Sequence, residues 1–344
     1  MVRRKSLASL KEYETEAKRK LSQKLIDYIY SGSEYESTLK RNVESYSKFL
    51  LRRRVLQGVQ HVDTDFSYFD GRIQSELPFF PSCINVSEMY PDAILDVLKV
   101  SKRFKVPILI SEISLTPPEF SHLPKLVNGD SPLIWQIYLR RGKREESLRR
   151  AERAKSLGYS GVAITVDTEL NIKLGFRELE AHDFLAVTPG DIREVRRRTS
   201  LPLIVKGVMT GEDAKIAIES GADGVVVSNH GARILDQGQA TIEVLPEIVK
   251  EVRSKRSTRH AEIFLDGGIR KGTDILKALA LGSRGCLLGR PIFWGLALDR
   301  QNGVGNVMQI LKSELIRAAA LCGVRKLSEV DPRTVVRSED SGAF

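Results

Sequence analysis

The chain has 344 residues, a formal net charge of +10 and a hydrophobic fraction of 42%. This length suits one large barrel domain or two smaller domains, and the composition is ordinary for a globular enzyme. The basic residues are scattered among acids and do not alternate with aromatics, which argues against a nucleic-acid-binding protein. No apolar run approaches the roughly 20 residues that a membrane-spanning helix needs. We therefore expect an enzyme whose positive field attracts an anionic substrate and an anionic cofactor.

The three cysteines are far apart and follow neither a metal-ligand spacing nor a disulfide pattern. The sequence therefore predicts no metal site and favours a reducing compartment. The basic first residues are not followed by an apolar stretch, and the last residues do not match a peroxisomal signal. We expect a cytoplasmic protein.

The first 55 residues have the pattern of helices. Residues 7–29 carry apolar side chains at helical spacing among Lys and Glu, and Ser31, Gly32 and Ser33 interrupt that pattern. A second helical pattern covers residues 34–51 and ends at three consecutive arginines. We expect residues 1–76 to form a helical extension that packs on the following domain.

From residue 77 onward, short apolar runs alternate with amphipathic stretches. The runs cover residues 79–84, 106–111, 133–138, 161–167, 202–208, 224–230, 262–268 and 285–290. Helical patterns between them cover residues 145–157, 191–199, 212–220, 242–254 and 272–281. Eight alternating units predict an α/β fold, a (β/α)8 TIM barrel over residues 77–330 with a tail over 331–344. An open doubly wound sheet is disfavoured, because no G-x-G-x-x-G motif follows an early strand.

The most informative segment lies directly after the buried run of valines at 225–227. It places Ser228, His230 and Arg233 at the carboxyl end of a predicted strand, where barrel enzymes carry their chemistry. An imidazole accepts a proton near neutral pH, and a guanidinium three residues later can hold a carboxylate with two hydrogen bonds. This pair is what the abstraction of a proton from a hydroxy acid requires.

Other predicted strands also end in polar residues, and these should gather at one face of the barrel. They are Ser111, Gln136, Tyr138, Thr165, Asp167, Lys206, Asp266, Gly268, Arg270, Gly289 and Arg290. The glycines and arginines after the last two strands favour a phosphate site, because barrel enzymes often bind phosphate there.

These motifs resemble those of the FMN-dependent α-hydroxy-acid oxidases and dehydrogenases, which include glycolate oxidase and the flavocytochrome-type lactate dehydrogenase. The similarity runs from about residue 25 to about residue 330 and is strongest over 203–290. The resemblance implies an FMN cofactor. It implies that FMN contacts Ser111, Gln136, Thr165, Lys206, Ser228, Asp266, Gly268, Arg270, Gly289 and Arg290, with the phosphate at the last two pairs.

The resemblance also implies oxidation of an L-2-hydroxy acid to a 2-oxo acid. His230 is then the base and Asp167 orients it, while Lys206 stabilises reduced flavin. His230 takes the hydroxyl proton while a hydride passes to flavin N5, or alternatively takes the proton on Cα first. Arg233 and Tyr28 hold the carboxylate; Tyr28 lies in the matching motif at 27–32.

Tyr138 matches a tyrosine near the substrate hydroxyl. The electron acceptor is oxygen or a carrier, and a homo-oligomer, a tetramer by analogy, is expected. Two alternatives stay open. One is another FMN barrel enzyme, such as the flavin-type isopentenyl-diphosphate isomerase. The other is a flavin-binding relative with little turnover.

The chain departs from the family pattern at four places, one of which is the segment from Asp167 to Pro202, shorter than the family's usual lid. A Pro-Thr-Ala-like turn after the first strand is replaced by residues 82–86. The position of a second substrate arginine falls on Leu174, where Lys173 or Arg177 could substitute, and an aromatic is replaced by Ile113. We expect these changes to favour larger, apolar 2-hydroxy acids over small ones.

Overall fold

The computed structural model describes residues 7–338, except 116, 128, 130, 141, 169–172, 175–176 and 179–185. Its main sheet has eight parallel strands in the order β4-β13-β12-β11-β10-β7-β6-β5, and β4 also contacts β5, so that the sheet closes into a barrel. The strands are β4 (Phe79–Pro81), β5 (Ile108–Ser111), β6 (Leu133–Ile137), β7 (Gly161–Thr165), β10 (Leu203–Val208), β11 (Gly224–Val227), β12 (Glu262–Leu265) and β13 (Gly285–Leu288).

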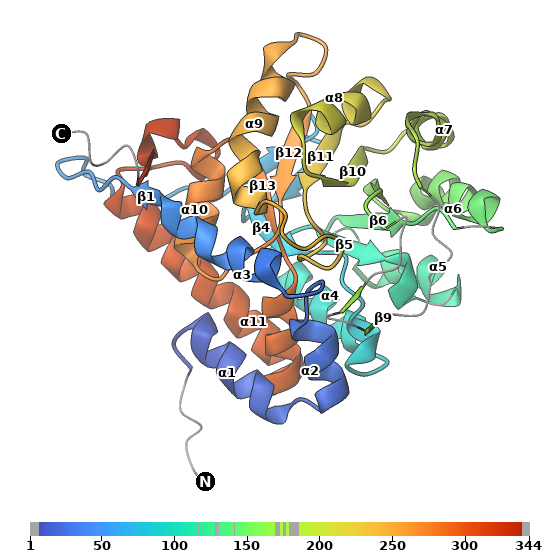
Figure 1. The fold of residues 1–344 in the computed structure, drawn as a ribbon, viewed down its shortest axis with the longest axis horizontal. Helices are drawn as coiled ribbons and strands as arrows, with labels where there is room; N and C mark the ends of the chain where they lie inside the picture. The colour runs from blue at the N-terminus through green and yellow to red at the C-terminus, as the bar shows by residue number, and fades with distance from the viewer. Residues whose placement is uncertain are drawn as a thin grey trace.

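A helix follows each barrel strand along the chain and packs outside it (Figure 1). These helices are α4 (Ala93–Phe104), α5 (Pro117–Val127), α6 (Arg144–Leu157), α7 (Pro189–Arg198), α8 (Gly211–Glu219), α9 (Thr241–Ser254), α10 (Gly272–Ala280) and α11 (Arg290–Leu321). The predicted (β/α)8 barrel is confirmed. The long helix α11 is broken at Asp299 and Arg300, whose backbone angles are not helical.

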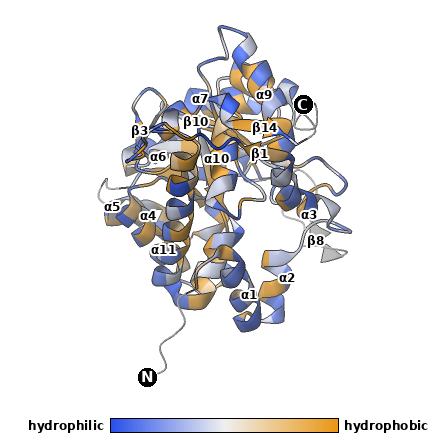
Figure 2. Ribbon diagram, turned by 90° about the vertical axis from the view of Figure 1, so that its left-hand side faces the viewer, coloured by the Kyte–Doolittle hydropathy of each residue, from blue (hydrophilic) through white to orange (hydrophobic). Residues whose placement is uncertain are grey.

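The barrel strands are continuous apolar runs because they are buried on both faces. In β11 the valines at 225–227 are almost fully buried, which is typical of a parallel strand covered by helices. Along α9 and α11, hydrophobic and hydrophilic residues alternate, as expected for helices with one face on the barrel (Figure 2). No helix in the described part of the chain is long and apolar enough to cross a membrane.

A hairpin of β2 (Phe66–Tyr68) and β3 (Ile73–Ser75) covers the amino ends of the barrel strands. Tyr68 packs its ring against Phe80 and Phe264, and the Phe69 amide donates to the Glu262 carboxylate at the start of β12. The opposite end of the barrel, where the strands finish, is therefore the end left for a ligand.

The amino-terminal segment differs from its prediction in two ways. The predicted helix over 7–29 is two helices, α1 (Leu10–Lys20) and α2 (Gln23–Tyr30), because the Ser22 side chain accepts a hydrogen bond from the Leu25 amide and starts a new helix. The second pattern is helical only in α3 (Ser37–Glu44) and the 3-10 turn η1 (Ser45–Lys48).

Residues beyond η1 were expected to be helical, and that expectation is wrong. They form β1 (Phe49–Leu51), which pairs antiparallel with β14 (Val335–Arg337) from the other end of the chain. A pairing across almost the whole chain leaves no local sequence pattern. The two small strands β8 (Lys173–Leu174) and β9 (Arg177–Glu178) form a separate antiparallel pair.

Candidate active site

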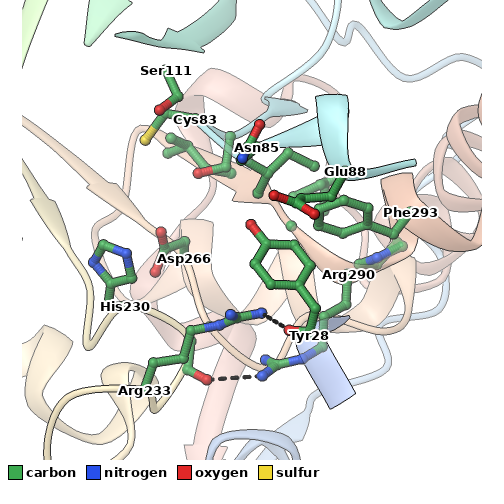
Figure 3. Close-up of a pocket in the computed structure, with 18 of the residues that line it drawn as sticks. Tyr28, Cys83, Asn85, Glu88, Ser111, His230, Arg233, Asp266, Arg290 and Phe293 are labelled. Atoms are coloured by element: carbon green, nitrogen blue, oxygen red, sulfur yellow. Dashed lines mark hydrogen bonds between the residues drawn. The ribbon is translucent and has the colours of Figure 1, made fainter. Parts of the chain in front are cut away.

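A cavity of about 1200 Å³ opens at the carboxyl ends of the barrel strands, beside α2. Figure 3 shows His230, Arg233 and Tyr28 around it, with Ser111 and Cys83 on the opposite wall. Its lining includes these predicted site residues: Tyr28, Ser111, Tyr138, Lys206, His230, Arg233, Asp266, Gly268, Arg270, Gly289 and Arg290. The barrel thus brings together residues that are far apart in the sequence.

The turn after β11 holds His230 in a strained conformation. Three successive residues, His230, Gly231 and Ala232, have positive φ angles of 55°, 66° and 64°. A side chain at positive φ costs on the order of 1 kcal/mol or more, and such strain concentrates at functional sites. The His230 amide donates to the Ser228 hydroxyl at 3.2 Å, which fixes the start of the turn.

Asp167 orients the imidazole from behind the cavity wall. Its Oδ1 lies 3.0 Å from Nδ1 of His230, so that Nε2 is the ring nitrogen left for a ligand. Burial alone would raise the pKa of Asp167, but the hydrogen bond and charge of His230, together with the charge of Lys206, bring it below its ordinary value. Asp167 is therefore a carboxylate.

Gly207 makes this contact possible, and sequence reasoning missed it. Its φ is +109°, and a Cβ there would lie 2.5 Å from the Asp167 side chain. The pairing of β10 with β11 shifts register between Lys206 and Val208, which is a β-bulge at the glycine. A glycine inside a strand pattern is the signal that could have indicated this close approach.

Lys206 is buried at the floor of the cavity with its charge intact. Its Nζ lies 3.2 Å from Asp266 Oδ2 and donates to the Ser228 hydroxyl at 2.8 Å. Burial alone would lower the pKa of Lys206, but the neighbouring charge of Asp266 raises it above its ordinary value. Ser228 thus connects the lysine to the His230 turn.

Gln136 and Thr165 are fully buried on neighbouring strands. Gln136 Nε2 donates to the Thr165 hydroxyl at 2.9 Å and to the Ile137 carbonyl at 2.8 Å. Gln136 Oε1 and Asp266 Oδ1 have no hydrogen-bond partner among the described residues. Buried acceptors of this kind are rarely left unpaired, so they indicate a missing donor.

Three arginines gather on the side of the cavity formed by β11, β12 and β13. Burial and the like charges of Arg233 and Arg270 hold the pKa of Arg290 well below its ordinary value. Within the described ranges, none of the three guanidiniums has a carboxylate at ion-pair distance. A buried cationic cluster of this kind requires an anionic ligand.

Two of these arginines also hold the carboxyl end of α2. Arg233 donates to the Tyr28 carbonyl at 2.6 Å and its guanidinium lies 5.0 Å from the Tyr28 ring centroid. Arg290 donates to the carbonyls of Ile29, Ser31 and Gly231. Cations are favourable at a helix carboxyl end, and this contact brings Tyr28 over the cavity.

The two tyrosines of the site are neutral phenols. Burial raises the pKa of Tyr28, and burial raises that of Tyr138 well above its ordinary value. Both can therefore donate a hydrogen bond into the cavity. Arg270, like Arg233, also lies over an aromatic ring, with its guanidinium 4.9 Å from the Trp294 ring centroid.

The residues present fit FMN. The arginine cluster suits a phosphate, the unpaired Asp266 oxygen suits a ribityl hydroxyl, and the ammonium of Lys206 suits a ring edge that gains negative charge. Gly289 leaves open space, since a Cβ there would meet only Ile84 at 3.7 Å. At position 268 glycine is required by the protein itself, because a Cβ there would overlap the Asn42 carbonyl.

Several lining residues were absent from the predicted set. They include Cys83 and Asn85 from the turn that departs from the family pattern, Glu88 just after it, and Phe293 from α11. Ile113 lines the cavity as the departure suggested. The structure does not describe the side chains of Lys173, Leu174 and Arg177. The replacement of the second substrate arginine by Lys173 or Arg177 therefore stays a prediction.

The fold and the site define a flavin-binding barrel oxidoreductase. The family model for FMN-dependent dehydrogenases matches residues 17–183 and 175–337. The chain is 34% identical to mouse 2-hydroxyacid oxidase 1, over 96% of each chain, and 34% identical to glycolate oxidase 3 of indica rice, over 97% of each.

Solved structures agree with these sequence matches. A mandelate oxidase variant with (S)-mandelic acid superposes with a TM-score of 0.86 at 29% identity, covering 96% of this chain and 98% of that one. A flavocytochrome b2 variant with pyruvate gives 0.88 at 29% identity, covering 98% and 88%. The chain belongs to the FMN-dependent dehydrogenase family. The predicted family, FMN cofactor and enzyme class, an oxidase or dehydrogenase of 2-hydroxy acids, are confirmed.

Proposed function

We propose that His230 is the base in the FMN-dependent oxidation of an L-2-hydroxy acid to its 2-oxo acid in this cavity. The observation that carries the assignment is the 3.0 Å contact of His230 Nδ1 with the Asp167 carboxylate, next to Arg233 on the same wall. Asp167 stabilises the imidazolium that forms on proton uptake, and Nε2 takes the proton from the substrate.

Arg233 and Tyr28 hold the substrate carboxylate. Their side chains face the same part of the cavity, and neither guanidinium nor phenol is committed to a carboxylate among the described residues. Tyr138 donates a hydrogen bond to the oxygen that becomes the carbonyl. These contacts fix which hydrogen of the substrate meets the base.

FMN, when bound, supplies the two-electron acceptor. Arg270, Arg290 and the backbone at Gly268 and Gly289 hold its phosphate. Ser111, Gln136, Thr165, Ser228 and Asp266 hold the remainder. Lys206 keeps a positive charge beside the ring, which favours the reduced state.

Substrates with a larger apolar side chain should react better than small ones. Ile113 and Phe293 give the cavity an apolar wall, and the relative solved with (S)-mandelic acid supports an acid of that size. Oxygen or a carrier then takes the electrons. We expect the protein to be cytoplasmic and to form a homo-oligomer, a tetramer by analogy with its family.

A turnover panel tests this function. The holoenzyme is supplied with glycolate, lactate, mandelate and longer 2-hydroxy acids, once with oxygen and once with a dye acceptor, and the 2-oxo acid is measured. Isomerisation of isopentenyl diphosphate is assayed separately. We expect kcat/KM to rise with apolar side-chain size. Turnover of isopentenyl diphosphate but of no hydroxy acid would favour the isomerase alternative. Flavin retention without any turnover would favour the relative that only binds flavin.

A further inference from the structure

Glu112 is a buried carboxylate outside the site described above. It follows Ser111 directly, in the 3-10 turn η3 (Glu112–Ser114), and its side chain is 1% exposed. Acids are almost never this buried unless they are paired. None of the predicted roles involves it, so its burial requires another explanation.

The Glu112 carboxylate connects the end of β5 to the chain that leaves β6. These strands are neighbours, with Ser111 opposite Gln136. Beyond that pair, Glu112 Oε1 accepts a hydrogen bond from the Tyr138 amide at 3.2 Å. The carboxylate thus takes the place of the next strand hydrogen bond, at the residue whose phenol enters the cavity.

Two arginines compensate the buried charge. Arg140 Nε lies 3.6 Å from Oε1, and Arg150 NH1 of α6 lies 3.6 Å from Oε2. Both come from the chain that follows Tyr138, so the acid draws the exit of β6 toward β5. Burial nevertheless raises the pKa of Glu112, and its Oε2 has no hydrogen-bond partner among the described residues.

We propose that Glu112 is a positioning residue, which fixes the backbone of Tyr138 and thereby directs its phenol at the reacting oxygen of the substrate. The inference rests on the proposed function, because it takes the role of Tyr138 from there. The inference adds a structural reason why the Tyr138 phenol is held in one position. A displacement of about 1 Å in a substrate-contacting group can cost on the order of a hundredfold in rate.

A double-mutant cycle on the FMN-loaded enzyme tests the inference. Glu112→Ala should lower kcat by about tenfold and change KM little, since the carboxylate ligands stay in place. In a Tyr138→Phe background the same substitution should cost less than about twofold, because the group that it positions is already gone. In an Arg233→Lys background it should keep its full effect.

Two further variants separate positioning from general stability. Glu112→Gln keeps an acceptor for the Tyr138 amide and should recover most of kcat. Asp96→Ala is the matched control, because Asp96 is also a buried acid, paired with Arg300 at 2.9 Å and accepting from the Tyr90 hydroxyl, but does not line the cavity. It should lower thermal stability and leave kcat unchanged.

The outcomes distinguish the inference from the proposed function. If Glu112→Ala lowers kcat as much in the Tyr138→Phe background as in the parental enzyme, the inference is overturned and the proposed function is unaffected. A Tyr138→Phe enzyme with the parental kcat would overturn the role of Tyr138 and the inference with it. If Glu112→Ala does not fold, equal kcat for Glu112→Gln and Tyr138→Phe variants, each tenfold down, would also count against a positioning role.

Discussion

His230 combines three constraints in one residue. Its amide is held by Ser228, its Nδ1 by Asp167, and its backbone sits at a positive φ that a non-glycine residue rarely adopts. Each constraint limits where Nε2 can point. A base that must take a proton from one defined position benefits from such limits more than a structural histidine would.

Replacing His230 by Ala should retain FMN and slow substrate-driven flavin reduction by roughly 10²–10⁴-fold, the usual contribution of a general base. Flavin retention is expected because the arginine cluster is untouched. Rapid-mixing measurement of flavin absorbance under anaerobic conditions gives the rate. Reduction of the variant at close to the parental rate would show that another group takes the proton.

Arg290 has two functions that one substitution removes together. Arg290→Ala should weaken FMN binding by about 1–3 kcal/mol, the scale of a lost charge-assisted hydrogen bond. It should also loosen α2, because the carbonyls of Ile29 and Ser31 lose their donor. Flavin release on dialysis measures the first effect. Arg284→Ala is the control, since Arg284 pairs with Glu262 away from the cavity. Unchanged flavin retention in Arg290→Ala would contradict the assignment of Arg290 to the phosphate.

The two phosphate-side glycines should respond differently to a methyl group. Gly268→Ala should lower the free energy of unfolding by about 2 kcal/mol or more, since its φ is +77° and the Cβ overlaps the Asn42 carbonyl. Gly289→Ala has room in the protein and should keep its stability but bind FMN about tenfold more weakly. Denaturation of flavin-free protein and flavin titration measure the two effects. Equal FMN affinity in Gly289→Ala would place the phosphate elsewhere.

At the scale of elements, the acid Glu243 helps to join the amino-terminal segment to the barrel. Glu243 of α9 accepts from Arg41 at 2.7 Å and Ser45 at 2.9 Å, and it also pairs with Lys48. Burial alone would raise the pKa of Glu243, but these partners lower it from 4.5 to about 2. The segment that they fix leads from α3 into β1.

A lowered pKa sets the sign of the pH dependence. The ionised Glu243 contributes its full stability above pH 4.5, and the contribution is lost as the pH falls toward about 2. Glu243→Gln should therefore unfold about 1–3 kcal/mol more easily near neutral pH, with a difference that narrows in acid. Urea denaturation across this range measures it. Glu44→Gln is the control, because the Glu44 side chain is 63% exposed. A loss of unfolding free energy in Glu243→Gln that does not change with pH would contradict the lowered pKa of Glu243.

The elements show which features a sequence can reveal. The eight barrel strands were predictable because each is a short apolar run between helices, a pattern that is local. The pairing of β1 with β14 was not, since its partners lie at opposite ends of the chain. His230 and Arg233 follow one strand and form a local motif, whereas the Glu112–Tyr138 bond connects two strand ends and is visible only in the fold.

At the scale of the whole molecule, the barrel gathers cations at one end. Lys206, Arg233, Arg270 and Arg290 come from four neighbouring strands, and only Lys206 has a carboxylate at ion-pair distance among the described residues. This arrangement is costly for the empty protein and favourable once anions bind. The unpaired cations therefore favour binding of an anionic cofactor and an anionic substrate at the same end of the barrel.

Anaerobic reduction of the bound flavin by a single 2-hydroxy acid tests the central claim most directly. The purified holoenzyme is mixed with the L and D forms of mandelate or a longer acid, and the visible flavin absorbance and the 2-oxo acid are measured together. The account predicts that the L form bleaches the flavin with one 2-oxo acid formed per flavin, and that the D form does not. An intact flavin spectrum with every L-2-hydroxy acid would contradict it.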